Sequence, residues 1–95
     1  MTQITVKTVS EQDPMTFQVT VADAGGSTRH AVTLSTATWR RLGAGETTPT
    51  QCVEAAFRFL LDREPKESIL ERFDLTLIAH YFPEFDRKLA DYLPR

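Results

Sequence analysis

Alternating apolar and polar residues occupy the first third of the chain. The alternation runs through residues 3–9, is longest over 15–21, and returns over 30–34. A period of two is typical of half-buried β-strands. Between the last two runs, Gly25-Gly26 can adopt positive φ, which favours a tight hairpin. The pattern therefore predicts a three-stranded antiparallel meander over about residues 3–35.

Beyond residue 35 the apolar residues recur every three or four positions, which is the period of an amphipathic α-helix. The clearest helical start follows Thr48, where Pro49 and Gln51 complete a capping box. Shorter helical patterns cover residues 66–73, where Pro65 precedes the segment, and the stretch after Asp74, which is expected to cap a further helix.

These patterns together predict one α+β domain over residues 1–95, with strands over about 3–35 and helices over about 36–93. A three-stranded sheet cannot cover its own apolar side chains, so three to four short helices are expected to pack on one sheet face. Threonines, Gln18 and Arg29 fall on the opposite face, which is expected to stay open. The predicted core comprises Phe17, Val19, Val21, Val32, Leu34, Val53, Phe57, Leu60, Ile69, Ile78 and Phe82.

The composition is that of an ordinary folded domain, with 41% hydrophobic and 25% charged residues. The net charge of −2 demands no polyanionic partner. The N-terminal residues lack the continuous apolar run of a signal peptide, and no apolar stretch is long enough for a membrane span. One cysteine fits a reducing compartment, so we expect a cytoplasmic protein without membrane association.

A resemblance to known sequences emerges from the second half of the chain. The residues that carry it run from His30-Ala31-Val32-Thr33-Leu34 through Cys52–Leu70 to Arg72-Phe73-Asp74-Leu75 and Tyr81-Phe82-Pro83-Glu84-Phe85. Over about two thirds of its length the chain resembles a group of small uncharacterised bacterial proteins. The resemblance implies a bacterial origin and a shared fold, and it lends no functional residue.

Residues that usually carry chemistry are scarce. His30 and His80 have no second histidine or cysteine at ligand spacing, so neither a metal nor a cofactor is predicted. His30 is expected at a sheet margin and His80 facing water. Cys52 lies near a helix N-terminus, where the helix dipole could lower its pKa and produce a reactive thiol. A thiol-dependent enzyme is therefore the third hypothesis, behind two binding functions, and no catalytic residue is assigned.

Residues 66–82 follow a helix, turn, helix pattern that invites a nucleic-acid-binding interpretation. The second predicted helix presents Thr76, Leu77, His80 and Tyr81 outward, with no lysine or arginine to contact phosphates. Nucleic-acid binding is therefore the alternative hypothesis and not the favoured one.

The favoured hypothesis is a protein-interaction or regulatory module without catalytic activity, which binds a protein partner or forms a homodimer. A sheet with free edges can accept another strand, and a small domain has little interior in which to bury its aromatic residues. Tyr81, Phe85 and Tyr92 are expected to be exposed and to contact the partner.

Overall fold

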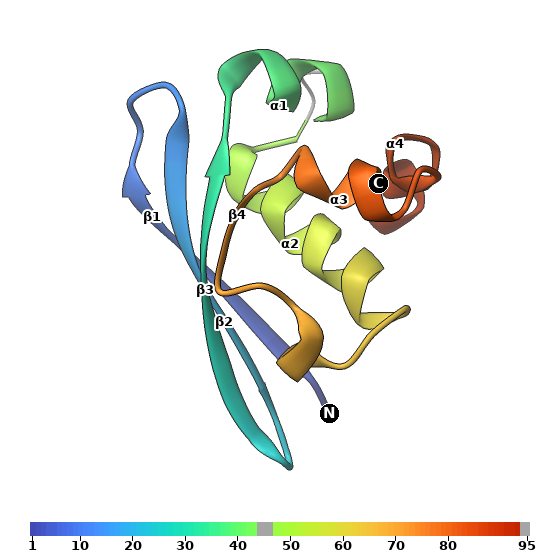
Figure 1. Cartoon of the computed structure of the whole chain (residues 1–95). Coiled ribbons are helices and arrows are strands. Elements are labelled where there is room, and N and C mark those ends of the chain that lie inside the picture. Colours follow the sequence, from blue (N-terminus) through green and yellow to red (C-terminus); the bar gives the residue numbers. More distant parts are fainter. Residues whose placement is uncertain (44–46, 94–95) are drawn as a thin grey trace.

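The computed structural model describes residues 1–43 and 47–93, which form a four-stranded sheet with all helices on one side (Figure 1). The elements in chain order are β1 (Gln3–Ser10), β2 (Met15–Asp23), β3 (Gly26–Leu34), α1 (Thr36–Gly43), α2 (Pro49–Leu61), the 3-10 helix η1 (Lys66–Ser68), β4 (Arg72–Asp74), α3 (Leu77–Tyr81), α4 (Phe85–Lys88) and the 3-10 helix η2 (Leu89–Tyr92). The predicted α+β class is confirmed, with a fourth strand added.

The meander of β1, β2 and β3 is antiparallel, as the alternation predicts. The register between β2 and β3 runs from Met15 opposite Leu34 to Asp23 opposite Gly26, which leaves a two-residue turn. Gly26 has a φ of 121°, a conformation that side chains with a Cβ rarely adopt. The turn therefore depends on glycine at this position.

An extended segment that ends in the short strand β4 replaces most of the helix predicted over residues 66–73, and that prediction is wrong. Only η1 is helical there, and the chain then extends alongside β3 in parallel. Two backbone hydrogen bonds continue the ladder beside the register pairs: Ala31 N–H donates to Glu71 O at 2.7 Å, and Leu75 N–H donates to Thr33 O at 2.9 Å. The edge of β3 gains backbone partners that a helix could not supply.

Asp74 ends β4 and, contrary to the sequence prediction, is not the N-cap of the following helix; that position is held by Thr76. Its carboxylate accepts hydrogen bonds from the Thr33 hydroxyl at 2.6 Å and from the Thr76 backbone N–H at 3.1 Å. Helix α3 begins only at Leu77. Asp74 therefore fixes the turn between β4 and α3 and ties it to β3.

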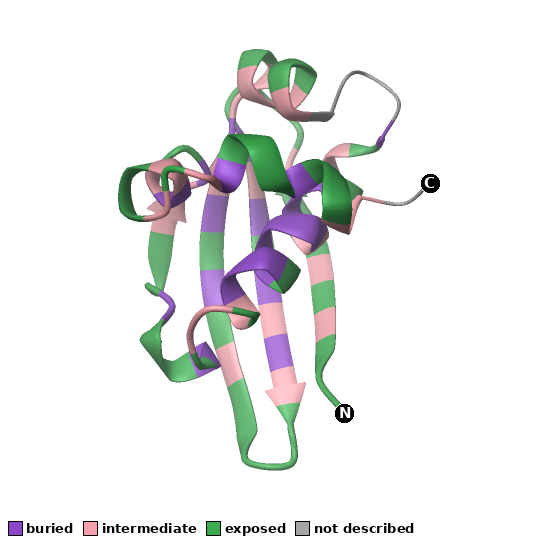
Figure 2. Ribbon diagram, turned by 90° about the vertical axis from the view of Figure 1, so that its right-hand side faces the viewer, coloured by how far each residue is buried: buried purple, intermediate pink, exposed green. Residues whose placement is uncertain are grey.

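Helix α2 lies at the centre of the molecule. Its predicted capping box is present: Gln51 N–H donates to Thr48 Oγ1 at 3.1 Å, and Thr48 N–H donates to Gln51 Oε1 at 2.9 Å. The sheet covers one side of α2 and the C-terminal segments cover the other, so buried residues concentrate where α2 crosses the strands (Figure 2). Along β2 and β3 the buried positions alternate with more exposed ones, which leaves the far face of the sheet open.

The core agrees closely with the prediction. Ten of the eleven predicted residues are buried, and Phe82 is half-buried against them. A second group of aromatic residues surrounds Phe59, whose ring centroid lies 5.1 Å from that of Phe85 and 6.0 Å from that of Phe82. Within residues 1–43 and 47–93, every helix is too short or too polar to cross a bilayer.

Candidate functional site

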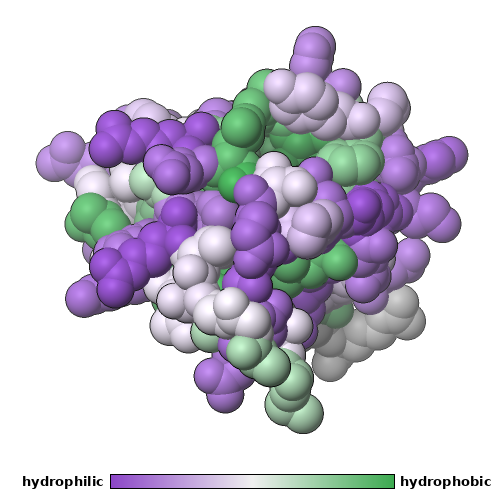
Figure 3. Space-filling model, turned by 60° about the horizontal axis from the view of Figure 1, so that its bottom comes forward, coloured by the Kyte–Doolittle hydropathy of each residue, from purple (hydrophilic) through white to green (hydrophobic). Residues whose placement is uncertain are grey.

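An apolar groove opens between the end of α2, the segment from η1 to β4, and α3. Its volume is about 330 Å³. On the face of the molecule that Figure 3 shows, hydrophobic side chains (green) are exposed between hydrophilic ones (purple). The lining residues are mostly aliphatic and aromatic: Leu60, Glu64, Ser68, Ile69, Leu70, Phe73, Leu77, Ile78, Tyr81 and Phe82.

The groove has a buried floor and an exposed apolar rim. Leu60, Ile69 and Ile78 are each at most 6% exposed and belong to the core. Leu70 is 48% exposed and Tyr81 is 64% exposed, and both line the groove. Exposed large side chains that converge on one concave surface are typical of binding sites, whereas scattered ones are ordinary.

Glu64 is the one charged residue in this lining. Burial raises the pKa of its carboxyl group above the ordinary value. Among the described residues, its side chain has neither a hydrogen bond nor an ion pair. A half-buried carboxylate without a partner beside apolar side chains favours a ligand that brings a positive charge.

His30 holds the rim of the groove from behind. Its Nδ1 lies 2.7 Å from Leu70 O, and its Nε2 lies 2.8 Å from the Thr28 hydroxyl. A carbonyl oxygen only accepts, so Nδ1 carries a proton and donates to Leu70. The ring is 3% exposed and packs on Phe57, with 5.4 Å between the centroids. His30 thus fixes the position of the Leu70 backbone, and with it the position of the Leu70 side chain in the groove lining.

Lys66 anchors the start of the same segment to the β2–β3 hairpin. Its Nζ lies 2.9 Å from Asp23 Oδ1 and 2.7 Å from Glu67 Oε2, and its side chain is 6% exposed. The hydrogen bond from Lys66 lowers the pKa of Asp23. Because η1 is tied at Lys66 and again through His30, the chain between them holds one shape across the groove.

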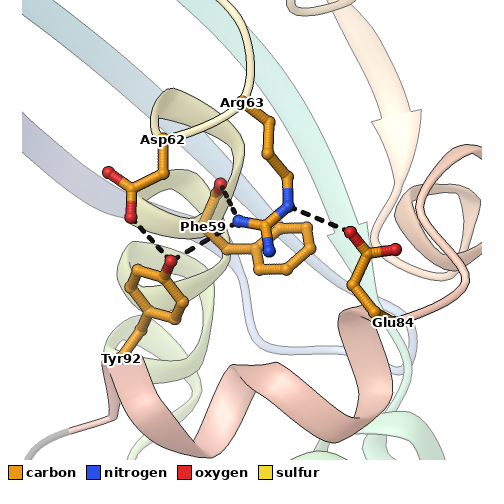
Figure 4. A network of polar contacts seen from close by, with 5 residues as sticks. All are labelled: Phe59, Asp62, Arg63, Glu84 and Tyr92. Atoms are coloured by element: carbon orange, nitrogen blue, oxygen red, sulfur yellow. Dashed lines mark hydrogen bonds and ion pairs between the residues drawn. The ribbon is translucent and has the colours of Figure 1, made fainter.

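The C-terminal end of α2 and the residues that follow it carry a network that fastens the C-terminal segments (Figure 4). The Arg63 guanidinium lies 3.6 Å from the Phe59 ring centroid, and its Nε donates to Glu84 at 3.2 Å. The Tyr92 hydroxyl donates to Asp62 Oδ2 at 2.6 Å. These contacts join α2 to the C-terminal segments and keep α3 beside the groove.

The three aromatic residues predicted to contact a partner have different environments. Tyr81 is exposed on the groove rim, as expected. Phe85 is fully buried, so its expected exposure is wrong. It fills the space between α4 and Phe59. Tyr92 is half-buried, and its hydroxyl is engaged in the network around Arg63.

Cys52 does not have the properties of a reactive thiol. Its side chain is fully buried, and burial raises its pKa to about 11. Burial therefore does not support the possible reactive thiol, because desolvation of a thiolate outweighs the effect of the helix N-terminus. His30 is bonded to Leu70 and His80 is exposed beside Tyr81, so the structure does not assemble these residues into a catalytic group.

The helix-turn-helix interpretation of residues 66–82 is also wrong as a structure. Its first helix is the three-residue η1 followed by β4, and its second is the five-residue α3. Within the part of the chain that the structure describes, no cluster of three or more histidine, cysteine, aspartate or glutamate residues could hold a metal ion.

Glu64 and Leu70 are site residues that the sequence pattern did not predict. A signal was present, because Phe73 and Leu75 alternate with Arg72 and Asp74 as in a strand. Reading this strand would have placed Leu70 in an extended connection between Lys66 and β4.

Comparison with protein-family models, curated proteins and solved structures finds no match to this chain.

Proposed function

We propose that the protein is a non-catalytic, cytoplasmic interaction module of a bacterial cell that binds a short segment of a partner protein in the apolar groove. The observation that carries this proposal is the convergence of two exposed apolar side chains, Leu70 and Tyr81, on a groove whose carboxylate has no partner among the described residues. Such a site offers apolar contact and one directed charge interaction.

Charge complementarity defines the occupant. The segment has two neighbouring large apolar side chains that enter the groove, and a lysine or arginine that meets Glu64. A cation beside the half-buried carboxylate restores the interaction that Glu64 loses on leaving water. A volume of about 330 Å³ lies at the low end of ligand pockets, which suits a few side chains better than a large cofactor.

The groove is held in shape before any partner arrives, which favours affinity. His30 fixes Leu70, Lys66 fixes η1, and the network around Arg63 fastens the C-terminal segments. Because these contacts restrict the groove in the free protein, little conformational entropy is lost when the partner binds.

Selection of peptides from a random phage-displayed library on the immobilised full-length protein tests the proposal. Selected peptides should carry two large apolar residues and a nearby lysine or arginine. Fluorescence anisotropy with the synthetic peptides then compares Leu70→Asp with Val9→Asp. Leu70 is 48% exposed in the groove and Val9 is 63% exposed outside its lining, so both variants add one charge to an exposed apolar site.

The binding affinity should fall at least tenfold in Leu70→Asp, which corresponds to a loss of about 1.4 kcal/mol or more, and it should stay within twofold in Val9→Asp. Glu64→Gln should weaken peptides that contain the basic residue and leave their alanine-substituted versions unchanged. Peptides that bind both aspartate variants equally, or that lack the basic residue, would show that the groove is not the site.

A further inference from the structure

The face of the sheet opposite the helices carries a group of exposed cations. Lys7 lies on β1, Arg29 on β3 and Arg72 on β4, and all three are exposed. None of them forms an ion pair with another described residue. No helix in the described part of the chain covers this face, as Figure 1 shows.

The strand register places these cations across the sheet. Lys7 is opposite Gln18, Gln18 is opposite Ala31, and Ala31 is opposite Arg72. With about 4.8 Å between neighbouring strands, Lys7 and Arg72 lie about 14 Å apart at their Cα atoms.

Arg29 sits beside this row. It precedes Ala31 by two residues on β3, so both point to the same face. A shallow hollow of about 350 Å³ lies beside the row, and Gln18, Arg29, Ala31 and Arg72 are among its lining residues. The small side chain of Ala31 leaves room between the two arginines.

Among the described residues, the open face carries few of the features of a protein interface. Protein partners usually need large apolar or aromatic anchors at the centre of the contact. In the described structure the exposed large hydrophobic residue that borders this hollow is Val9, at the edge of the sheet. Beside buried Phe17 and small Ala31, the hollow is lined by the Thr16 hydroxyl, the Gln18 amide and the guanidinium groups of Arg29 and Arg72, which bind through charge and hydrogen bonds.

We infer that this face binds the phosphodiester backbone of a single-stranded nucleic acid, at a site separate from the groove. Arginine offers a planar fork that matches phosphate and also stacks on unpaired bases. Three cations spread over about 14 Å can contact successive phosphates of one strand. Gln18 and Thr20 lie between them and can hydrogen bond to sugars or bases.

Two acidic residues border the row. The carboxylate of Asp74 is occupied by the Thr33 and Thr76 hydroxyls. Glu71 is exposed and lines the hollow next to Arg72. Its charge opposes phosphate, so Glu71→Gln should strengthen binding.

Anisotropy of a short fluorescein-labelled oligothymidylate, titrated with the full-length protein at several salt concentrations, tests the site. Three phosphate contacts on a single strand give a slope of log K against log salt of about −2. Affinity should then fall roughly 20-fold between about 50 and 200 mM salt. The double variant Arg29→Ala/Arg72→Ala should keep one phosphate contact, so its affinity should fall only roughly 2.5-fold over the same rise in salt concentration.

The matched control is Arg87→Ala/Lys88→Ala, which removes two exposed charges from α4 and should leave the slope unchanged. Circular dichroism of both double variants confirms folding. Absence of binding at low salt, or equal slopes for both double variants, would overturn the inference. So would equal affinity for a polyglutamate peptide of the same charge, because the face would then bind acidic proteins as well as phosphates.

Discussion

The contact between His30 and Leu70 connects the stability of the fold with the shape of the groove, and its removal has a calculable effect. His30→Leu keeps an apolar side chain against Phe57 but leaves the Leu70 carbonyl and the Thr28 hydroxyl without their ring partners. Each hydrogen bond contributes about 1 kcal/mol net. The variant should therefore be about 2 kcal/mol less stable, and its Tm should fall by roughly 8–16 °C.

Two further variants separate the two ring nitrogens. Asparagine places its amide nitrogen near the position of Nδ1, so His30→Asn should keep the bond to Leu70 O. Glutamine reaches the position of Nε2, so His30→Gln should keep the bond to the Thr28 hydroxyl and release Leu70. Both variants should lose about 1 kcal/mol of stability from the missing bond, but only His30→Gln should also weaken peptide binding.

Urea unfolding followed by the fluorescence of Trp39, the single tryptophan, measures these differences. Trp39 packs against the core, and its indole N–H donates to Thr47 O at 2.8 Å, so its emission reports global unfolding. The reasoning fails if His30→Leu is as stable as the native protein. It also fails if His30→Asn and His30→Gln bind the selected peptides equally.

Three other predictions concern buried groups. Cys52 should react slowly with Ellman's reagent in the native state and rapidly in urea, and fast native labelling would contradict its burial and raised pKa. Lys66→Met should lower the Tm at neutral pH, because it leaves Asp23 without its cation. The difference in Tm between this variant and the native protein should narrow below about pH 4, since the lowered pKa of Asp23 stabilises the fold only while its carboxyl is ionised. Phe85→Ala should cost about 3–5 kcal/mol in urea unfolding, whereas Tyr81→Ala should cost less than about 0.5 kcal/mol; equal losses would contradict their opposite burial.

Local sequence signals determined the parts of the fold that depend on neighbours along the chain. The β2–β3 hairpin follows from alternation and from the glycine with positive φ. The start of α2 follows from the capping box at Thr48, whose partner lies three residues away. Periodicity also identified most of the core, because side chains on one face of an element are buried together.

The tertiary structure decided what depends on residues far apart in sequence. Residues 72–74 became a strand because β3 offered an unpaired edge, which outweighed the helical spacing of that segment. Phe85 and Cys52 are buried because α2 is covered on both sides, which a one-dimensional pattern does not reveal. The groove and the open face of the sheet combine residues from elements that only folding brings together, so both proposed binding sites depend on long-range packing.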